Sequence, residues 1–214
     1  MHWDIEAILF DIDGTLVDST PAVTRNWQTW AARHGLDAQE VLRVCHGRRS
    51  RDTVADFLPA DQIEEATREL LELELSDIQG VTSLPGVPQL LASLPTGRWA
   101  AVTSGAEEVM RRRMEVAQLP LPEVMIAAGD VERGKPDPQG YQMAAAALDC
   151  DPRRCLVVED APAGVQAGLA AGATVLGVGT SHPLHELRDA SVVVEDLTGA
   201  LVEAGSGTLR FILA

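Results

Sequence analysis

Short, uninterrupted apolar runs recur along this chain of 214 residues, and stretches with helical spacing lie between them. The apolar runs are residues 7–10, 99–103, 124–128, 155–158, 174–178 and 192–194, and the clearest helical stretches are residues 106–117, 139–148 and 163–171. Runs without polar alternation are typical of strands buried on both faces of a parallel sheet. Their alternation with helices predicts an α/β fold with a doubly wound, Rossmann-like parallel sheet.

The first apolar run ends in two carboxylates, Asp11 and Asp13, which a Gly-Thr pair follows. Doubly wound sheets bind ligands beyond the C-terminal ends of their strands, which is where these carboxylates are expected. Asp11 could attack phosphorus and form an aspartyl-phosphate, while Asp13 could act as a general acid and then as a general base. Two adjacent carboxylates need a cation, and Mg²⁺ prefers oxygen ligands. The segment alone is equally compatible with a solvated turn, whereas the apolar Leu16-Val17 pair argues against a calcium loop.

Polar residues occupy comparable positions after two later strands. Thr103 and Ser104 end the second apolar run, Glu159 and Asp160 follow the fourth, and Lys135 lies between them before a proline. Taken singly, the Thr-Ser pair would more simply cap a helix, the lysine would be a surface residue and the acidic pair would begin a helix. Their occurrence together, in this order, favours one shared site at the C-terminal edge of the sheet.

These four segments resemble the motifs of the haloacid dehalogenase (HAD) superfamily, in the family's order and across nearly the whole chain. The matching segments are residues 11–15, 100–105, 134–136 and 156–160. The resemblance implies the HAD form of the doubly wound core. It also implies that Asp11 is the nucleophile and Asp13 the acid/base catalyst.

The same resemblance implies roles for the other motif residues. Thr103 would hydrogen-bond a phosphate oxygen, with Ser104 and Gly105 beside it as further substrate-binding residues. Lys135 would offset the negative charge between the phosphate and Asp11, a task that suits a compact ammonium group.

A Mg²⁺ site is implied as well. Its protein ligands would be Asp11, Asp160 and Asp13, the last through its backbone carbonyl. Glu159 would support these ligands from an outer shell. The net charge of −15 makes local positive groups and a metal necessary if the substrate is an anion.

A long insertion, residues 17–83, separates the first strand from the second. Its spacing predicts helices throughout, over residues 22–35, 38–45, 50–57 and 61–75. Its position resembles that of the small helical cap of one HAD subclass. We therefore expect a core domain of residues 1–16 and 84–214 and an inserted α-helical cap domain of residues 17–83.

The loop that begins at His46 concentrates positive charge in an acidic chain. Arg48 or Arg49 could bind a phosphate or sugar hydroxyl groups, and His46 could hydrogen-bond a hydroxyl group. An equally simple explanation is a solvated basic loop that pairs with carboxylates of the cap. Trp27 and Trp30, one helical turn apart, are expected in the core of the cap rather than as a sugar-stacking platform.

Three segments resemble particular enzymes within this family. They are residues 18–23, 46–49 and 158–164. They are similar to sugar phosphatases, and to the glycerol-phosphate and 2-deoxyglucose-6-phosphate phosphatases of the same subclass. This implies Mg²⁺-dependent hydrolysis of a small phosphorylated sugar or polyol. The alternative is a phosphosugar mutase of the β-phosphoglucomutase type, although Thr15 looks more like the phosphatases. Asp13 and Asp160 argue against a dehalogenase, and the complete motif set argues against a non-catalytic binding protein.

Composition restricts partners and location. A sequence pI near 4.6 argues against a nucleic-acid partner. The N-terminus lacks the features of a signal peptide, and no apolar run is long enough to cross a membrane. Three cysteines with this spacing suggest reduced thiols and a cytoplasmic location. We expect a monomer or a small homo-oligomer.

Overall fold

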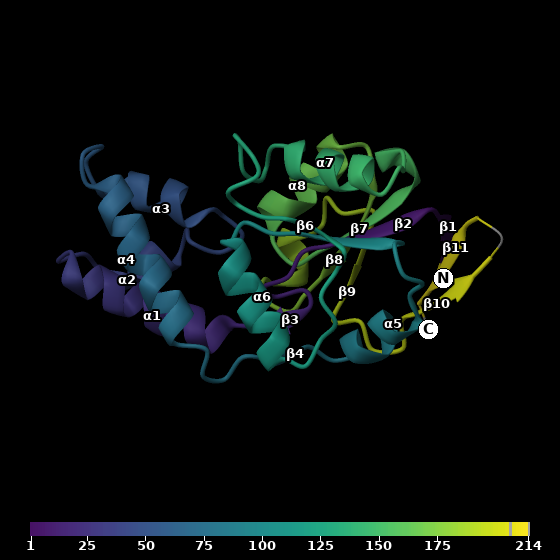
Figure 1. Cartoon of the computed structure of the whole chain (residues 1–214), viewed down its shortest axis with the longest axis horizontal. Coiled ribbons are helices and arrows are strands. Elements are labelled where there is room, and N and C mark those ends of the chain that lie inside the picture. The colour runs from purple at the N-terminus through teal and green to yellow at the C-terminus, as the bar shows by residue number, and fades with distance from the viewer. Residues whose placement is uncertain (206, 214) are drawn as a thin grey trace.

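The computed structural model describes residues 1–205 and 207–213, which form an α/β core with a helical insertion at one end (Figure 1). A six-stranded sheet in the order β6-β5-β2-β7-β8-β9 lies at the centre of the core, and all its pairings are parallel. Its strands are β2 (Ala7–Phe10), β5 (Trp99–Val102), β6 (Val124–Ile126), β7 (Cys155–Glu159), β8 (Thr174–Val178) and β9 (Val192–Val194). The predicted doubly wound parallel sheet is confirmed.

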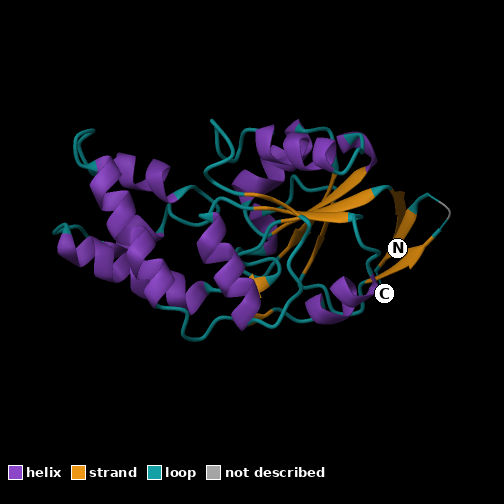
Figure 2. Ribbon diagram, in the orientation of Figure 1, coloured by secondary structure: helices purple, strands orange, loops and turns teal. Residues whose placement is uncertain are grey.

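Helices cover both faces of this sheet (Figure 2). They are α5 (Val87–Ser93), α6 (Glu107–Val116), α7 (Gln139–Ala147) and α8 (Pro162–Ala170), together with the short 3₁₀ helices η1 (Pro152–Arg154) and η2 (Leu184–Glu186). Successive side chains of β2 enter different hydrophobic clusters, Ile8 and Phe10 with α5 and α6, and Ala7 and Leu9 with α7 and α8. Because strand side chains alternate between faces, the apolar run fills both layers.

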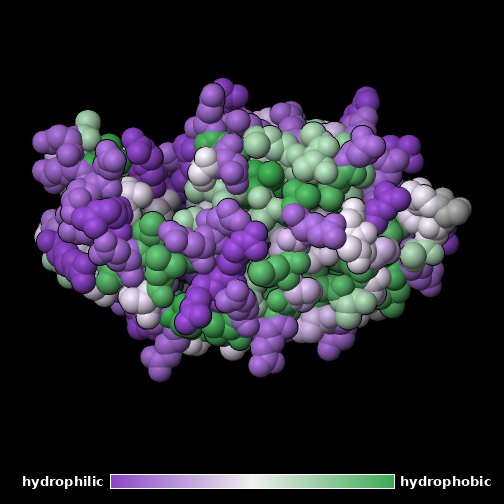
Figure 3. All heavy atoms as spheres, in the orientation of Figure 1, coloured by the Kyte–Doolittle hydropathy of each residue, from purple (hydrophilic) through white to green (hydrophobic). Residues whose placement is uncertain are grey.

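The helical insertion consists of α1 (Thr20–Arg33), α2 (Ala38–Leu42), α3 (Ser50–Phe57) and α4 (Ile63–Ser76). It has its own hydrophobic cluster, in which Trp27 and Trp30 pack edge to face at 5.3 Å. The prediction that both tryptophans belong to the insertion's core is confirmed. On the face seen in Figure 3, hydrophilic side chains cover most of the insertion.

The insertion is not helical at its two ends. There the chain forms β3 (Val17–Asp18) and β4 (Thr82–Ser83), which pair antiparallel. The two crossings between core and insertion lie side by side and satisfy each other's backbone groups. The expectation that the insertion is helical throughout is therefore wrong at its two ends.

A second, three-stranded antiparallel sheet joins the two ends of the chain (Figure 1). It contains β1 (His2–Ile5), β10 (Leu201–Ala204) and β11 (Leu209–Ile212), with β11 in the middle. Residues 205–214 carry only weak sequence signals for a helix or a strand, and of these, residues 206 and 214 lie outside the described part. None of the described helices is long and apolar enough to cross a membrane.

Candidate active site

Four sequence segments meet at the C-terminal edge of the parallel sheet. Asp11 follows β2, Thr103 follows β5, and Glu159 ends β7 immediately before Asp160. Since β5, β2 and β7 are neighbours in the sheet, their ends place these side chains around one point. Lys135, from the loop before α7, reaches the same point. The structure therefore brings together the motif residues that the sequence singled out.

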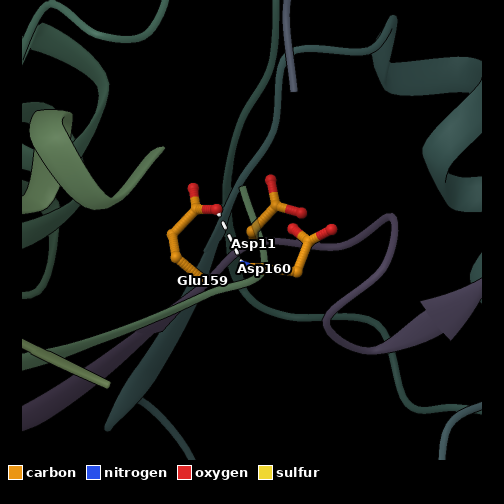
Figure 4. Close-up of side chains that lie close together, drawn as sticks. All are labelled: Asp11, Glu159 and Asp160. Atoms are coloured by element: carbon orange, nitrogen blue, oxygen red, sulfur yellow. Dashed lines mark hydrogen bonds between the residues drawn. The ribbon is translucent and has the colours of Figure 1, made fainter. Parts of the chain in front are cut away.

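Three carboxylates form the floor of the site (Figure 4). Asp11, Glu159 and Asp160 are only 6%, 1% and 4% exposed, and each offers an oxygen within 4.8 Å of the others. Burial, opposed by attraction to Lys135, raises the pKa of Asp11 well above its ordinary value. Burial and repulsion from Glu159 raise the pKa of Asp160 to about 7. A buried group of hard oxygen atoms that repel one another fits a divalent cation.

Lys135 is the only lysine in the sequence, and it lies between two of these carboxylates. Its Nζ is 2.5 Å from Asp11 Oδ1 and 2.6 Å from Glu159 Oε1, and it donates to the carbonyl of Val102 at 3.0 Å. Burial alone would lower the pKa of Lys135, but attraction to the carboxylates is stronger and the pKa is raised. The ammonium group therefore stays charged beside Asp11.

Glu159 is held on all sides by the protein. The hydroxyl group of Tyr141 donates to its Oε1 at 2.6 Å, and the amides of Asp160 and Ala161 donate to its Oε2 at 3.2 and 3.4 Å. A Cβ atom on Gly164, in α8, would lie 1.8 Å from the same carboxylate, so only glycine allows this helix to approach. Gly168, by contrast, packs against the sheet. The glycines of α8 thus allow the helix to approach both the Glu159 carboxylate and the sheet.

The Gly-Thr turn after Asp13 is shaped around Asp160. Gly14 has a φ of +83°, and a Cβ atom there would lie 2.0 Å from Asp160 Oδ2. Thr15 donates to Asp160 Oδ1 at 3.4 Å, and the hydroxyl group of Ser181 donates to Oδ2. The turn residue is therefore glycine for two reasons, its backbone conformation and its contact with a carboxylate.

Asp13 points to a different set of partners. Its Oδ2 accepts a hydrogen bond from Arg113 Nη1 at 2.5 Å, and Arg113 Nη2 donates to Glu74 Oε1 of α4 at 3.2 Å. The sequence did not suggest Arg113 or Glu74, nor Tyr141 or Ser181, as members of the site.

A cavity lies between the carboxylates and the helical insertion. From the core it is lined by Ser104 and Gly105, among others, and from the insertion by His46 and Arg48. Ser104 Oγ donates to the carbonyl of Gly47 at 2.9 Å and so links the two parts. Burial is the main cause that lowers the pKa of His46, and the nearby His182 ring lowers it further. Two of the three loop residues predicted to bind substrate therefore face the cavity.

Arg49, the third, does not line this cavity. Its guanidinium group binds Asp52 at 2.7 and 3.0 Å and the carbonyls of Val131 and Glu132 at 3.1 Å each. Arg48 is also paired, with Asp56 at 2.7 Å. The pairing of basic loop residues with carboxylates of the insertion, which the sequence also allowed, is therefore present, and Arg49 additionally fastens the loop to the core.

Sheet and site together define an α/β protein with a cluster of buried carboxylates at the C-terminal ends of two central strands. The family model of the haloacid dehalogenase-like hydrolases matches residues 5–172, and the chain belongs to this family. Hexitol phosphatase A of Escherichia coli is 44% identical over 198 residues, which cover 90% of this chain and 91% of that protein. Glycerol-1-phosphate phosphohydrolase 1 of Saccharomyces cerevisiae is 36% identical, with coverage of 86% and 79%.

The fold is also similar to that of a solved mutase. The crystal structure of β-phosphoglucomutase from Clostridium difficile has a TM-score of 0.78 at 24% identity, and the match covers 90% of this chain and 92% of that chain. At this identity the likeness concerns the fold alone.

The metal-free protein is expected to lose stability as pH rises through the titration range of Asp160. In the unfolded chain this carboxyl group ionises near pH 3.8, and in the folded protein at about pH 7. Between these values the folded protein binds more protons than the unfolded chain, so the free energy of unfolding falls as pH rises. We expect Asp160→Asn to weaken this dependence in thermal unfolding with EDTA at about pH 5 and about pH 8.

The exposed Asp61 provides a matched control for this prediction. Asp61→Asn makes the same chemical change on the surface of the insertion and should keep the wild-type pH dependence. An unchanged pH dependence in Asp160→Asn would show that this carboxyl group does not have a raised pKa in the folded protein.

Proposed function

We propose that the protein is a Mg²⁺-dependent phosphatase that hydrolyses monoesters of small sugars or polyols through an aspartyl-phosphate intermediate. The observation that carries the proposal is the buried Asp11, held 2.5 Å from Lys135 at the edge of a cavity. Relatives named as hexitol and glycerol-1-phosphate phosphatases support the substrate class.

In the proposed reaction, a carboxylate oxygen of Asp11 attacks phosphorus while the ester oxygen leaves. Lys135 offsets the charge that two anions bring together. Asp13 donates a proton to the leaving oxygen and then removes a proton from the water that releases phosphate. Thr103 accepts a hydrogen bond from the Gly105 amide at 3.1 Å, which leaves its own hydroxyl hydrogen available for a phosphate oxygen.

The carboxylate cluster fits the metal that this reaction needs. We propose Asp11, Asp160 and the backbone carbonyl of Asp13 as ligands of Mg²⁺, and a supporting position for Glu159, whose two oxygens already have protein partners. Bound Mg²⁺ would stabilise negative charge on the transferred phosphoryl group.

We further propose that residues 17–83 act as a cap over a core of residues 1–16 and 84–214. The insertion contributes His46 and Arg48 to the cavity that the core carboxylates line. Such a cap would contact the leaving group and exclude water from the reacting atoms.

Arg48→Met is expected to raise KM for phosphorylated sugars and polyols about 10-fold, the loss of one charged hydrogen bond. The KM for p-nitrophenyl phosphate should change much less, because its leaving group has no hydroxyl groups to bind. Steady-state kinetics on both esters measures the difference. Arg51→Met is the control, since Arg51 is exposed and lies outside the cavity. An equal rise in KM for both esters would show that Arg48 does not recognise the leaving group.

The experiment that tests the function is phosphate release from a panel of phosphorylated sugars, polyols and nucleotides, with Mg²⁺ and with EDTA. Metal-dependent release from the sugar and polyol esters is the expected result. Isomerisation of a hexose 1-phosphate without phosphate release would instead identify a mutase. No turnover of any ester would contradict both functions.

We also propose a cytoplasmic location. Cys45, Cys150 and Cys155 are free thiols, and burial raises the pKa of Cys45 and Cys155 to about 12. Thiols that remain unpaired are typical of a reducing compartment.

A further inference from the structure

A chain of ionic contacts connects Asp13 to the helical insertion. Arg113, in α6 of the core, binds Asp13 at 2.5 Å with one terminal nitrogen and Glu74 of α4 at 3.2 Å with the other. In the described part of the chain, the Arg113–Glu74 pair is the one ion pair that joins the insertion to the core. All three residues line the cavity of the candidate site.

Burying this ion pair costs more free energy than a purely structural contact would require. The Arg113 side chain is 1% exposed, and its Nε has no partner among the described residues. A buried ion pair with an unsatisfied donor is often no more stable than apolar residues of similar size. Arg113 also lies on the face of α6 that otherwise contributes Val109, Met110 and Met114 to the core. The hydrogen bond that Arg113 donates to Asp13 explains its position better than packing in the core does.

We propose that Arg113 is a positioning residue for Asp13, and that Glu74 makes this positioning depend on the insertion lying over the core. The proposal rests on the proposed function, in which Asp13 protonates the leaving oxygen. Arg113 occupies Oδ2 of Asp13, whereas Oδ1 has no partner among the described residues. The guanidinium group thus limits rotation of the carboxylate and leaves Oδ1 as the oxygen that can carry the proton.

The effect of losing this positioning on the rate of ester cleavage depends on the leaving group. An alkoxide of a sugar or polyol leaves slowly without a proton, whereas p-nitrophenolate leaves readily without one. General acid catalysis contributes about 10²–10⁴-fold to such reactions. Loss of positioning should therefore slow the first step, in which the leaving group departs, selectively for alkyl esters. The second step, in which Asp13 acts as the base for hydrolysis of the aspartyl-phosphate, is common to both kinds of ester and is slowed equally.

The test compares the single-turnover rate of alcohol release from a hexitol phosphate or glycerol 1-phosphate with that of p-nitrophenol release from p-nitrophenyl phosphate, because these rates report the first step alone. For Arg113→Met we expect the rate of this first step to fall by about 10²-fold or more for the alkyl ester and by less than about 5-fold for the aryl ester. Arg113→Lys should restore part of the difference, and Glu74→Gln should show the same selectivity more weakly. Arg112→Met, one residue away on the exposed face of α6, should behave as the wild type.

An equal fall for both esters, or no fall for either, would overturn the proposal. If Arg113→Met does not fold, the double variant Arg113→Met/Glu74→Gln removes both charges of the buried pair and gives the same comparison. Wild-type turnover tests the proposed function separately, because that function fails if the wild type releases no phosphate. The positioning role fails only if an active wild type loses no selectivity in the variants.

Discussion

Phosphate release by the Asp11→Asn variant is expected to fall by about 10⁴-fold or more, while the fold stays intact. The amide has the size of the carboxylate but cannot act as the nucleophile that forms an aspartyl-phosphate. Stability should be preserved or improved, because burial disfavours the ionised form of Asp11 and raises its pKa. Phosphate release with Mg²⁺, together with circular dichroism and Tm, measures both effects.

Asp61→Asn serves as the control, since Asp61 is exposed on the insertion and should tolerate the change. Activity close to that of the wild type in folded Asp11→Asn protein would show that another group attacks phosphorus. Spontaneous deamidation of the asparagine has to be excluded by mass spectrometry before residual activity is interpreted.

Replacing Lys135 by methionine is expected to reduce kcat by about 10²–10³-fold, the usual cost of removing one preorganised charge from a transition state. It should also lower the free energy of unfolding by about 3–5 kcal/mol, because Asp11 and Glu159 would remain buried without their counter-ion. Kinetics at saturating substrate and denaturant unfolding with EDTA separate the two effects.

Lys135→Arg tests whether charge alone is sufficient. The Lys135 side chain is 6% exposed and lies between two carboxylates and the Tyr141 ring, so the larger planar guanidinium group should not restore activity. Arg133→Met, at an exposed site in the same loop, is the matched control. Full activity of either Lys135 variant would contradict the role assigned to this residue.

The parallel sheet could be predicted because each of its strands is recognisable from a short stretch of sequence. Each strand of the parallel sheet is mostly apolar, so β2, β8 and β9 were predicted with their observed bounds. The motif residues follow these runs directly, and the C-terminal ends of parallel strands share one edge. The position of the site therefore followed from the order of the motifs.

The small sheet could not be predicted because its pairing is remote in sequence. His2 pairs with Ile212, and although residues 209–213 are mostly apolar, nothing in either segment indicates that the two ends of the chain pair with each other. The short helix α5 was missed for a similar reason, since its seven residues bury only Val87, Leu90 and Leu91.

Within the site, the sequence could not show which residues from helices would turn toward Asp13 and Glu159. Tyr141 and Glu74 lie in amphipathic helices, where a buried polar residue is not distinguished by its neighbours in sequence. Arg113 did leave a signal, because it shares a helix face with Met110 and Met114. Among adjacent arginines of the loop, only the structure shows that Arg48 faces the cavity and Arg49 does not.

The central claim is that Asp11 carries the phosphoryl group during turnover. The most direct test is to quench the wild-type protein in acid during turnover of its best ester and to map phosphorylated peptides by mass spectrometry. We predict one added phosphoryl group on the peptide that contains Asp11, absent from Asp11→Asn and absent when EDTA replaces Mg²⁺. Rapid turnover by the wild type with no phosphoryl group on Asp11 at any quench time, or with the group on another residue, would contradict the account.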